Sequence, residues 1–103
     1  MQKKVKEFNN LVKKFHSKKI SVFARIIDIE SELGELGKEA LKSSKYGSND
    51  FVISEDFLME YGDALYALLS LACEHGISAE ECLEKSILKM KKRLEEKNNL
   101  ASN

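Results

Sequence analysis

The chain has 103 residues and a formal net charge of zero, and a third of its residues are charged. It contains no proline, few glycines and no apolar run long enough to cross a bilayer, so its composition favours helices over sheets and excludes a membrane span. The basic start lacks a following apolar core, and Cys73 and Cys82 lack the spacing of a zinc site. We therefore expect a cytoplasmic protein with free thiols.

Charge is distributed unevenly along the chain. Residues 1–20 hold seven lysines and one glutamate, residues 21–84 hold four basic and fourteen acidic groups, and residues 85–103 hold six basic and two acidic groups. An acidic centre between basic ends suits a metal ion bound at the centre, with basic side chains beside it that contact phosphate groups. For most of the lysines, a solvated surface is the better explanation.

The first two helices are predicted at residues 2–16 and 21–43. The first repeats apolar residues every three or four positions, which gives a short helix one apolar face. The second carries an apolar stripe and, beside it at the edge of the core, a narrow acidic stripe. The acids of this stripe are Asp28, Glu32, Glu35 and Glu39. Gly34 and Gly37 weaken this helix, which suggests that another helix packs closely on its other side.

The third helix is predicted to begin after Ser54, a suitable N-cap, and to end near His75 before Gly76. Residues 44–54 contain several turn formers and connect it to the second helix. Its apolar residues cover a much wider arc than burial on one side requires. A chain with few helices cannot cover that arc, so we expect this helix to pack against a second subunit.

The fourth helix is predicted from about 79 to 96, after a capping box at residues 78–81. Lys89 and Arg93 lie together on the flank of its apolar stripe. Residues 98–103 are expected to form a frayed tail. We predict an all-α fold in one domain of residues 1–97: a four-helix-type bundle with antiparallel neighbours that dimerises through the apolar third helix.

Two acidic pairs suggest the chemistry of the protein. Glu32 and Glu35 on the second helix, and Glu60 and Asp63 on the third, are each spaced i, i+3, so each pair projects from one helix face. Two like charges about 4 Å apart repel by roughly 4 kcal/mol at an effective dielectric near 20, and a divalent cation removes that cost. The pattern predicts a site with oxygen ligands, most suitably for Mg²⁺.

These acids belong to a longer ordered set of motifs. Residues 60–66 (EYGDALY), 72–78 (ACEHGIS) and 89–93 (KMKKR) follow the first acidic pair in order. Over residues 21–94 the set resembles the MazG-type superfamily of all-α NTP pyrophosphohydrolases. Because Phe15 to Lys19 replace the C-P-W-D-type segment of the longer members, the chain resembles the compact, single-domain ones.

The resemblance implies cleavage between the α- and β-phosphates of a nucleoside triphosphate, which yields a nucleoside monophosphate and pyrophosphate. It implies a Mg²⁺ cofactor, with Mn²⁺ as a substitute, and Glu32 or Glu35 as the group that helps to deprotonate the attacking water. The implied metal ligands are Glu32, Glu35, Glu60 and Asp63. The implied phosphate contacts are Lys89 and Arg93, with Arg25 and Lys45 as weaker candidates. We expect a homodimer, or a tetramer built as a dimer of dimers, with no nucleic-acid or membrane partner.

Two alternatives stay open at the level of the sequence. Residues 63–66 are similar to a run in phosphoribosyl-ATP pyrophosphohydrolases, although the Gly-Ser-Tyr-Thr-like segment of those enzymes is missing upstream. The other alternative is a non-catalytic helical dimer that binds a protein partner, in which the acids are incidental. A di-iron centre is disfavoured, because its characteristic Glu-x-x-His pairs are absent.

Overall fold

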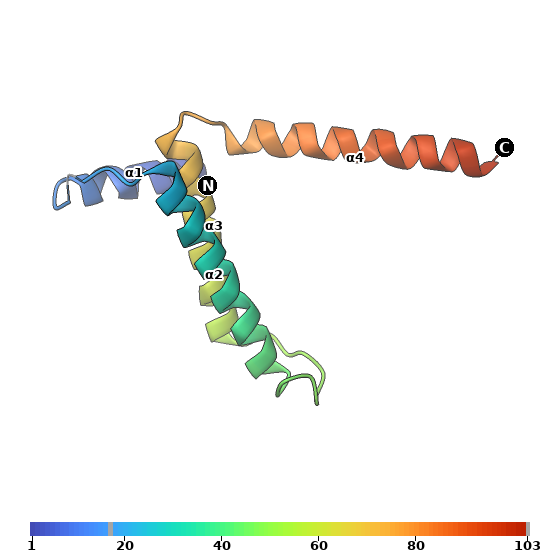
Figure 1. Ribbon diagram of the computed structural model, residues 1–103, viewed down its shortest axis with the longest axis horizontal. Helices are drawn as coiled ribbons and strands as arrows, with labels where there is room; N and C mark the ends of the chain where they lie inside the picture. Colours follow the sequence, from blue (N-terminus) through green and yellow to red (C-terminus); the bar gives the residue numbers. More distant parts are fainter. Residues whose placement is uncertain (17, 103) are drawn as a thin grey trace.

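The computed structural model describes residues 1–16 and 18–102, which fold into four helices and contain no strand. The helices are α1 (Gln2–Lys13), α2 (Val22–Ser43), α3 (Glu55–Glu74) and α4 (Ala79–Ser102) (Figure 1). The prediction of an all-α chain with four helices is confirmed. None of the described helices has both the length and the apolar content that crossing a lipid bilayer requires.

Serine side chains cap the starts of three helices. Ser21, Ser54 and Ser78 accept hydrogen bonds from backbone N–H groups three residues ahead, at 3.1, 3.0 and 3.2 Å. Each bond satisfies an N–H that has no partner inside the helix. After α3, Gly76 takes a left-handed conformation with φ of 62°, which glycine adopts without steric cost.

The end of α4 differs from the prediction. The helix continues to Ser102, beyond the end expected near residue 96. Residues 94–97 are good helix formers, and neither glycine nor proline follows them to stop the helix. Of the tail predicted at 98–103, residue 103 lies outside the described residues.

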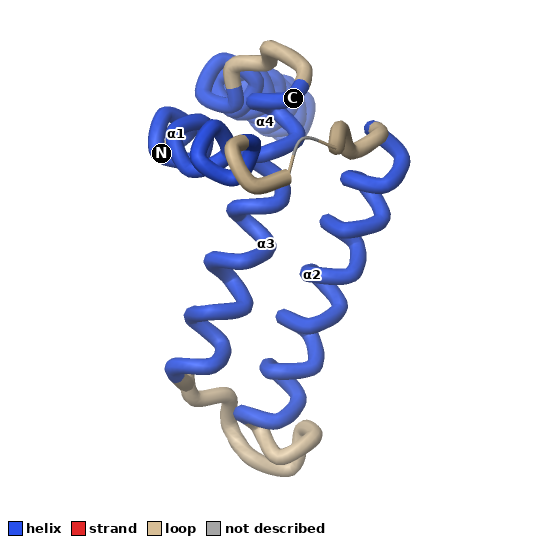
Figure 2. Tube along the Cα trace, turned by 90° about the vertical axis from the view of Figure 1, so that its left-hand side faces the viewer, coloured by secondary structure: helices blue, strands red, loops and turns tan. Residues whose placement is uncertain are grey.

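Three of the helices pack together and the fourth stands apart. The chain turns back at residues 44–54, so that α3 lies along α2, while α1 lies against the C-terminal half of α3 (Figure 2). From the end of α3, α4 points away from the α2/α3 pair (Figure 1). The acidic stripes of α2 and α3 are thus brought together within the pair, whereas the basic residues of α4 are held away from it.

The core within a single chain is small. Most of its buried apolar residues are alanines, which remove little apolar surface from water. They are Val5, Ala64, Ala67, Leu69 and Ala72. A Cβ atom added at Gly34 or Gly37 would have no neighbour within 4 Å beyond its own helix backbone among the described residues, so the close helix packing predicted there is not present in the described part of one chain.

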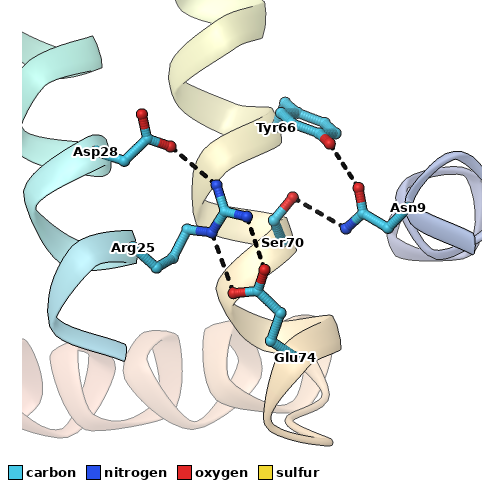
Figure 3. A network of polar contacts seen from close by, with 6 residues as sticks. All are labelled: Asn9, Arg25, Asp28, Tyr66, Ser70 and Glu74. Carbon is cyan, nitrogen blue, oxygen red and sulfur yellow. Dashed lines mark hydrogen bonds and ion pairs between the residues drawn. The ribbon is translucent and has the colours of Figure 1, made fainter. Parts of the chain in front are cut away.

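Polar contacts join α1 to α3. The side-chain amide of Asn9 donates to the hydroxyl of Ser70 at 3.2 Å, and the hydroxyl of Tyr66 donates to the amide oxygen of Asn9 (Figure 3). Ser70 is fully buried, and the ring of Phe8 meets the ring of Tyr66 edge-on at 5.8 Å. Because a buried polar group without a partner is costly, these bonds hold α1 in one register on α3.

Candidate metal-binding site

Three of the predicted acids meet between α2 and α3. Glu32 comes from the middle of α2, and Glu60 and Asp63 come from successive turns of α3. Each offers one carboxylate oxygen, and the three oxygens lie within 4.8 Å of one another. Glu32 and Glu60 are half-buried, while Asp63 is exposed. The contact between helices therefore unites two motifs that lie 28 positions apart in the chain, Glu32 and Glu60.

Electrostatics at this cluster favour protonation of two of its members. Partial removal from water raises the pKa of Glu32, and the charges of Asp63, Asp28 and Glu35 raise it further. The pKa of Glu60 is also raised, first by desolvation and then by Asp63 and the neighbouring glutamates. Both shifts mean that the folded chain holds these negative charges at a cost. A bound cation would reverse that balance.

Glu35, the fourth predicted ligand, is not one of the three clustered acids. It is exposed on α2. Its charge nevertheless contributes to the raised pKa of both Glu32 and Glu60. Glu35 therefore acts on the cluster electrostatically in this conformation, from just outside the group of three.

The predicted phosphate contacts are not gathered around the acids within one chain. Lys89 and Arg93 do lie together on α4, where Lys85 and Lys92 join them along one shallow surface groove. Since α4 points away from the α2/α3 pair, this groove is separate from the acidic cluster (Figure 1). Lys45 lies in the turn after α2, with φ of 47° and an exposed side chain.

Arg25, which was predicted to contact phosphate, is paired with two carboxylates of its own chain in this structure. Its side chain is buried, and it donates to both carboxylate oxygens of Glu74, from Nε at 3.1 Å and from Nη2 at 2.7 Å. Its Nη1 donates to Asp28 at 2.9 Å (Figure 3). The bidentate bond to Glu74 raises the pKa of Arg25, so the guanidinium stays charged. In this structure Arg25 ties the start of α2 to the end of α3.

Sequence reasoning did not identify Glu74 as the partner of Arg25. A signal for it exists, because helices joined by a short connection that reverses the chain bring the start of the first beside the end of the second. An arginine at the edge of the core in the first turn of α2 then faces an acid in the last turn of α3.

Comparisons with protein-family models, curated proteins and solved structures find nothing that matches this chain. The resemblance to the MazG-type superfamily stays a prediction from the motifs of residues 21–94. The chemistry of the site is therefore argued from its own residues.

The three carboxylates form a donor set made only of oxygens, which suits hard divalent cations such as Mg²⁺ and Mn²⁺. Mg²⁺ commonly binds one or two protein carboxylates and completes its coordination with water and substrate phosphates. The three carboxylates thus offer oxygen ligands that fit such a cation.

Proposed function

We propose that the protein is a Mg²⁺-dependent nucleoside triphosphate pyrophosphohydrolase, which cleaves (d)NTP to (d)NMP and pyrophosphate. The observation that carries the proposal is the meeting of Glu32, Glu60 and Asp63 within 4.8 Å across two helices. The ordered motifs of residues 60–66, 72–78 and 89–93 support it. Such a cluster would repel a polyanionic substrate in the absence of a cation, so the proposal includes Mg²⁺.

Each residue has a role in this proposal. When bound, Mg²⁺ would neutralise the phosphates and stabilise the charge on the leaving pyrophosphate. Glu60 and Asp63 would hold the metal together with Glu32. Glu32 or Glu35 would accept a proton from the attacking water. Glu35, whose charge already acts on Glu32 and Glu60, would be a further ligand.

The proposal includes a homodimer that associates through α3. Exposed apolar side chains remain on this helix outside its contacts with α1 and α2. They include Leu58, Tyr61 and Leu68, which are 50, 56 and 52% exposed. Apolar exposure of this extent on a helix that also carries the site supports a second subunit there, in a dimer or in a dimer of dimers.

The test is pyrophosphate release from ribo- and deoxyribonucleoside triphosphates, with and without Mg²⁺. We expect Mg²⁺-dependent release that is lost in Glu60→Gln and kept in Glu84→Gln. Glu84 is a matched control, because it is exposed on α4 away from the cluster. Release that is equal in both variants would refute the assigned site.

The two alternatives have separate signatures in this experiment. Mg²⁺ binding without pyrophosphate release from any of these substrates would favour phosphoribosyl-ATP as the substrate, and growth of a deletion strain without histidine would then decide. A folded protein that neither binds Mg²⁺ nor releases pyrophosphate would favour the non-catalytic helical dimer. The exposed apolar surface of α2, α3 and α4 is the observation that keeps this last alternative open.

A further inference from the structure

Helix α4 carries an apolar stripe that the described residues of its own chain leave exposed. Leu83, Ile87, Met90 and Leu94 follow one another at spacings of four, three and four, which places them on one side of the helix. They are 59, 40, 54 and 60% exposed. An amphipathic helix of this kind is stable in water chiefly because its apolar side packs against another element.

The direction of α4 is set by contacts that keep it away from its own α2/α3 pair. Gln2 of α1 donates from its side chain to the carbonyl of Ile77 at 2.6 Å and accepts from the backbone N–H of Ala79 at 2.9 Å. The backbone N–H of Ile77 donates to the carbonyl of Ala72 at 2.9 Å, which closes the turn around Gly76. These contacts hold the turn and the start of α4 beside α1.

The exposed surface of the chain is far larger than that of a compact monomer. Its accessible area is 8649 Å², whereas a folded monomer of 11.7 kDa exposes about 5,900 Å². The radius of gyration is 18.1 Å, compared with about 13 Å for a compact domain of this length. The surplus is about 2,750 Å² per chain, and twice that area falls at the upper end of the range for obligate homodimers.

A second copy of the chain offers a surface that fits the stripe. On the α2/α3 pair, the side opposite the acids exposes apolar residues from both helices, among them Ile26, Leu33 and Leu68. Pairing of two α4 helices alone is a weaker solution, because the stripe spans only two heptads and a stable coiled coil needs three or more.

We propose that α4 acts as an arm that packs its apolar stripe against the α2/α3 pair of a second copy of this chain. Each copy then covers the exposed apolar side of its partner's α2/α3 pair. Two chains together complete the helical bundle that a single chain leaves incomplete. The inference does not depend on the proposed reaction, since it rests on surface area and apolar spacing.

The test uses the full chain and two variants of adjacent residues. Ile87→Asp places a charge in the stripe, and Leu88→Asp places the same charge on the other side of the helix, at a residue that is 55% exposed. Light scattering after size exclusion gives the mass of each protein over a range of micromolar concentrations. Far-ultraviolet circular dichroism checks that both variants are still helical.

We expect a dimer for the unmodified chain and for Leu88→Asp. In a symmetric dimer, both α4 helices carry the substitution. Ile87→Asp should therefore raise the dissociation constant of the dimer by at least about 100-fold. Amide hydrogen exchange in α4 should also slow as the concentration of the unmodified protein rises. A monomer in the unmodified chain would overturn the proposal. An Ile87→Asp dimer as stable as the unmodified one would also overturn it, and would leave α3 as the interface. Equal dissociation of the Ile87→Asp and Leu88→Asp dimers would overturn it as well.

Discussion

The ion pairs of Arg25 allow a quantitative prediction. Arg25→Met keeps most of the side-chain volume but removes three charged hydrogen bonds, two to Glu74 and one to Asp28. Breaking a fully buried ion pair by removing one partner costs about 3–5 kcal/mol. The side chain of Arg25 is 9% exposed, but those of Glu74 and Asp28 are 27 and 44% exposed, so water stabilises the carboxylates left behind. We therefore expect a loss of about 2 kcal/mol in the free energy of unfolding.

Urea unfolding followed by far-ultraviolet circular dichroism, at one fixed protein concentration, measures this loss. The matched control is Lys42→Met, which removes the ion pair between Lys42 and Glu39 on the same helix. That pair is a single 3.5 Å contact between a lysine that is 49% exposed and a glutamate that is 14% exposed, so its removal should cost about 0.5–1 kcal/mol, less than the loss of three bonds at Arg25. Equal losses in the two variants would show that burial and bidentate geometry do not give Arg25 its assigned role.

Catalytic measurements on the same variant separate structure from substrate binding. If Arg25 ties α2 to α3 and does not touch phosphate, Arg25→Met should keep the KM for nucleoside triphosphate at temperatures well below its melting point. A large rise in KM in a fully folded variant would restore Arg25 as a phosphate contact. Glu74→Gln should reproduce the stability loss, because it removes the other side of the same bidentate pair.

Three further predictions concern the site and its support. Mg²⁺ should raise the melting temperature, because it binds the folded cluster and not the unfolded chain. Scanning fluorimetry should show that this increment vanishes in Glu60→Gln and persists in Glu84→Gln. An increment kept in both variants would place the metal elsewhere. Without metal, the raised pKa values of Glu32 and Glu60 mean that the folded chain binds more protons than the unfolded chain between the ordinary carboxyl pKa and the raised values. Stability should therefore fall as pH rises through that window, and Glu32→Gln should flatten the fall; an unchanged slope in urea titrations of this variant would contradict the assignment. Tyr66→Phe removes the bond to Asn9 and should cost about 1 kcal/mol in the same urea assay, whereas Tyr46→Phe, at a residue that is 75% exposed, should cost almost nothing.

Local features of the sequence predicted the helices well. Apolar residues at intervals of three and four identified each helix, and Ser54 and Gly76 marked the limits of α3 correctly. These signals depend on residues a few positions apart, so they act before any tertiary contact forms. The end of α4 was missed because the prediction stopped at the last apolar residues, while the helix-forming residues beyond them continue the helix.

The candidate site was predictable in part for the same reason. The i, i+3 spacing of Glu60 and Asp63 places both on one face of α3, and the acidic stripe of α2 lies at the edge of its core. The sequence thus named all three acids that meet. It could not show that Glu35 falls outside the group of three, because that depends on how α2 is rotated against α3.

Tertiary structure alone decided the partners of Arg25 and the position of α4. The pairing of Arg25 with Glu74 spans 49 positions in the chain, and it exists only because the turn at residues 44–54 returns α3 along α2. Periodicity identified the apolar stripe of α4 but carries no information on what faces it. The contacts of Gln2 with Ile77 and Ala79 direct this helix away from its own chain, because side chains far apart in sequence fix the angle of the turn between α3 and α4.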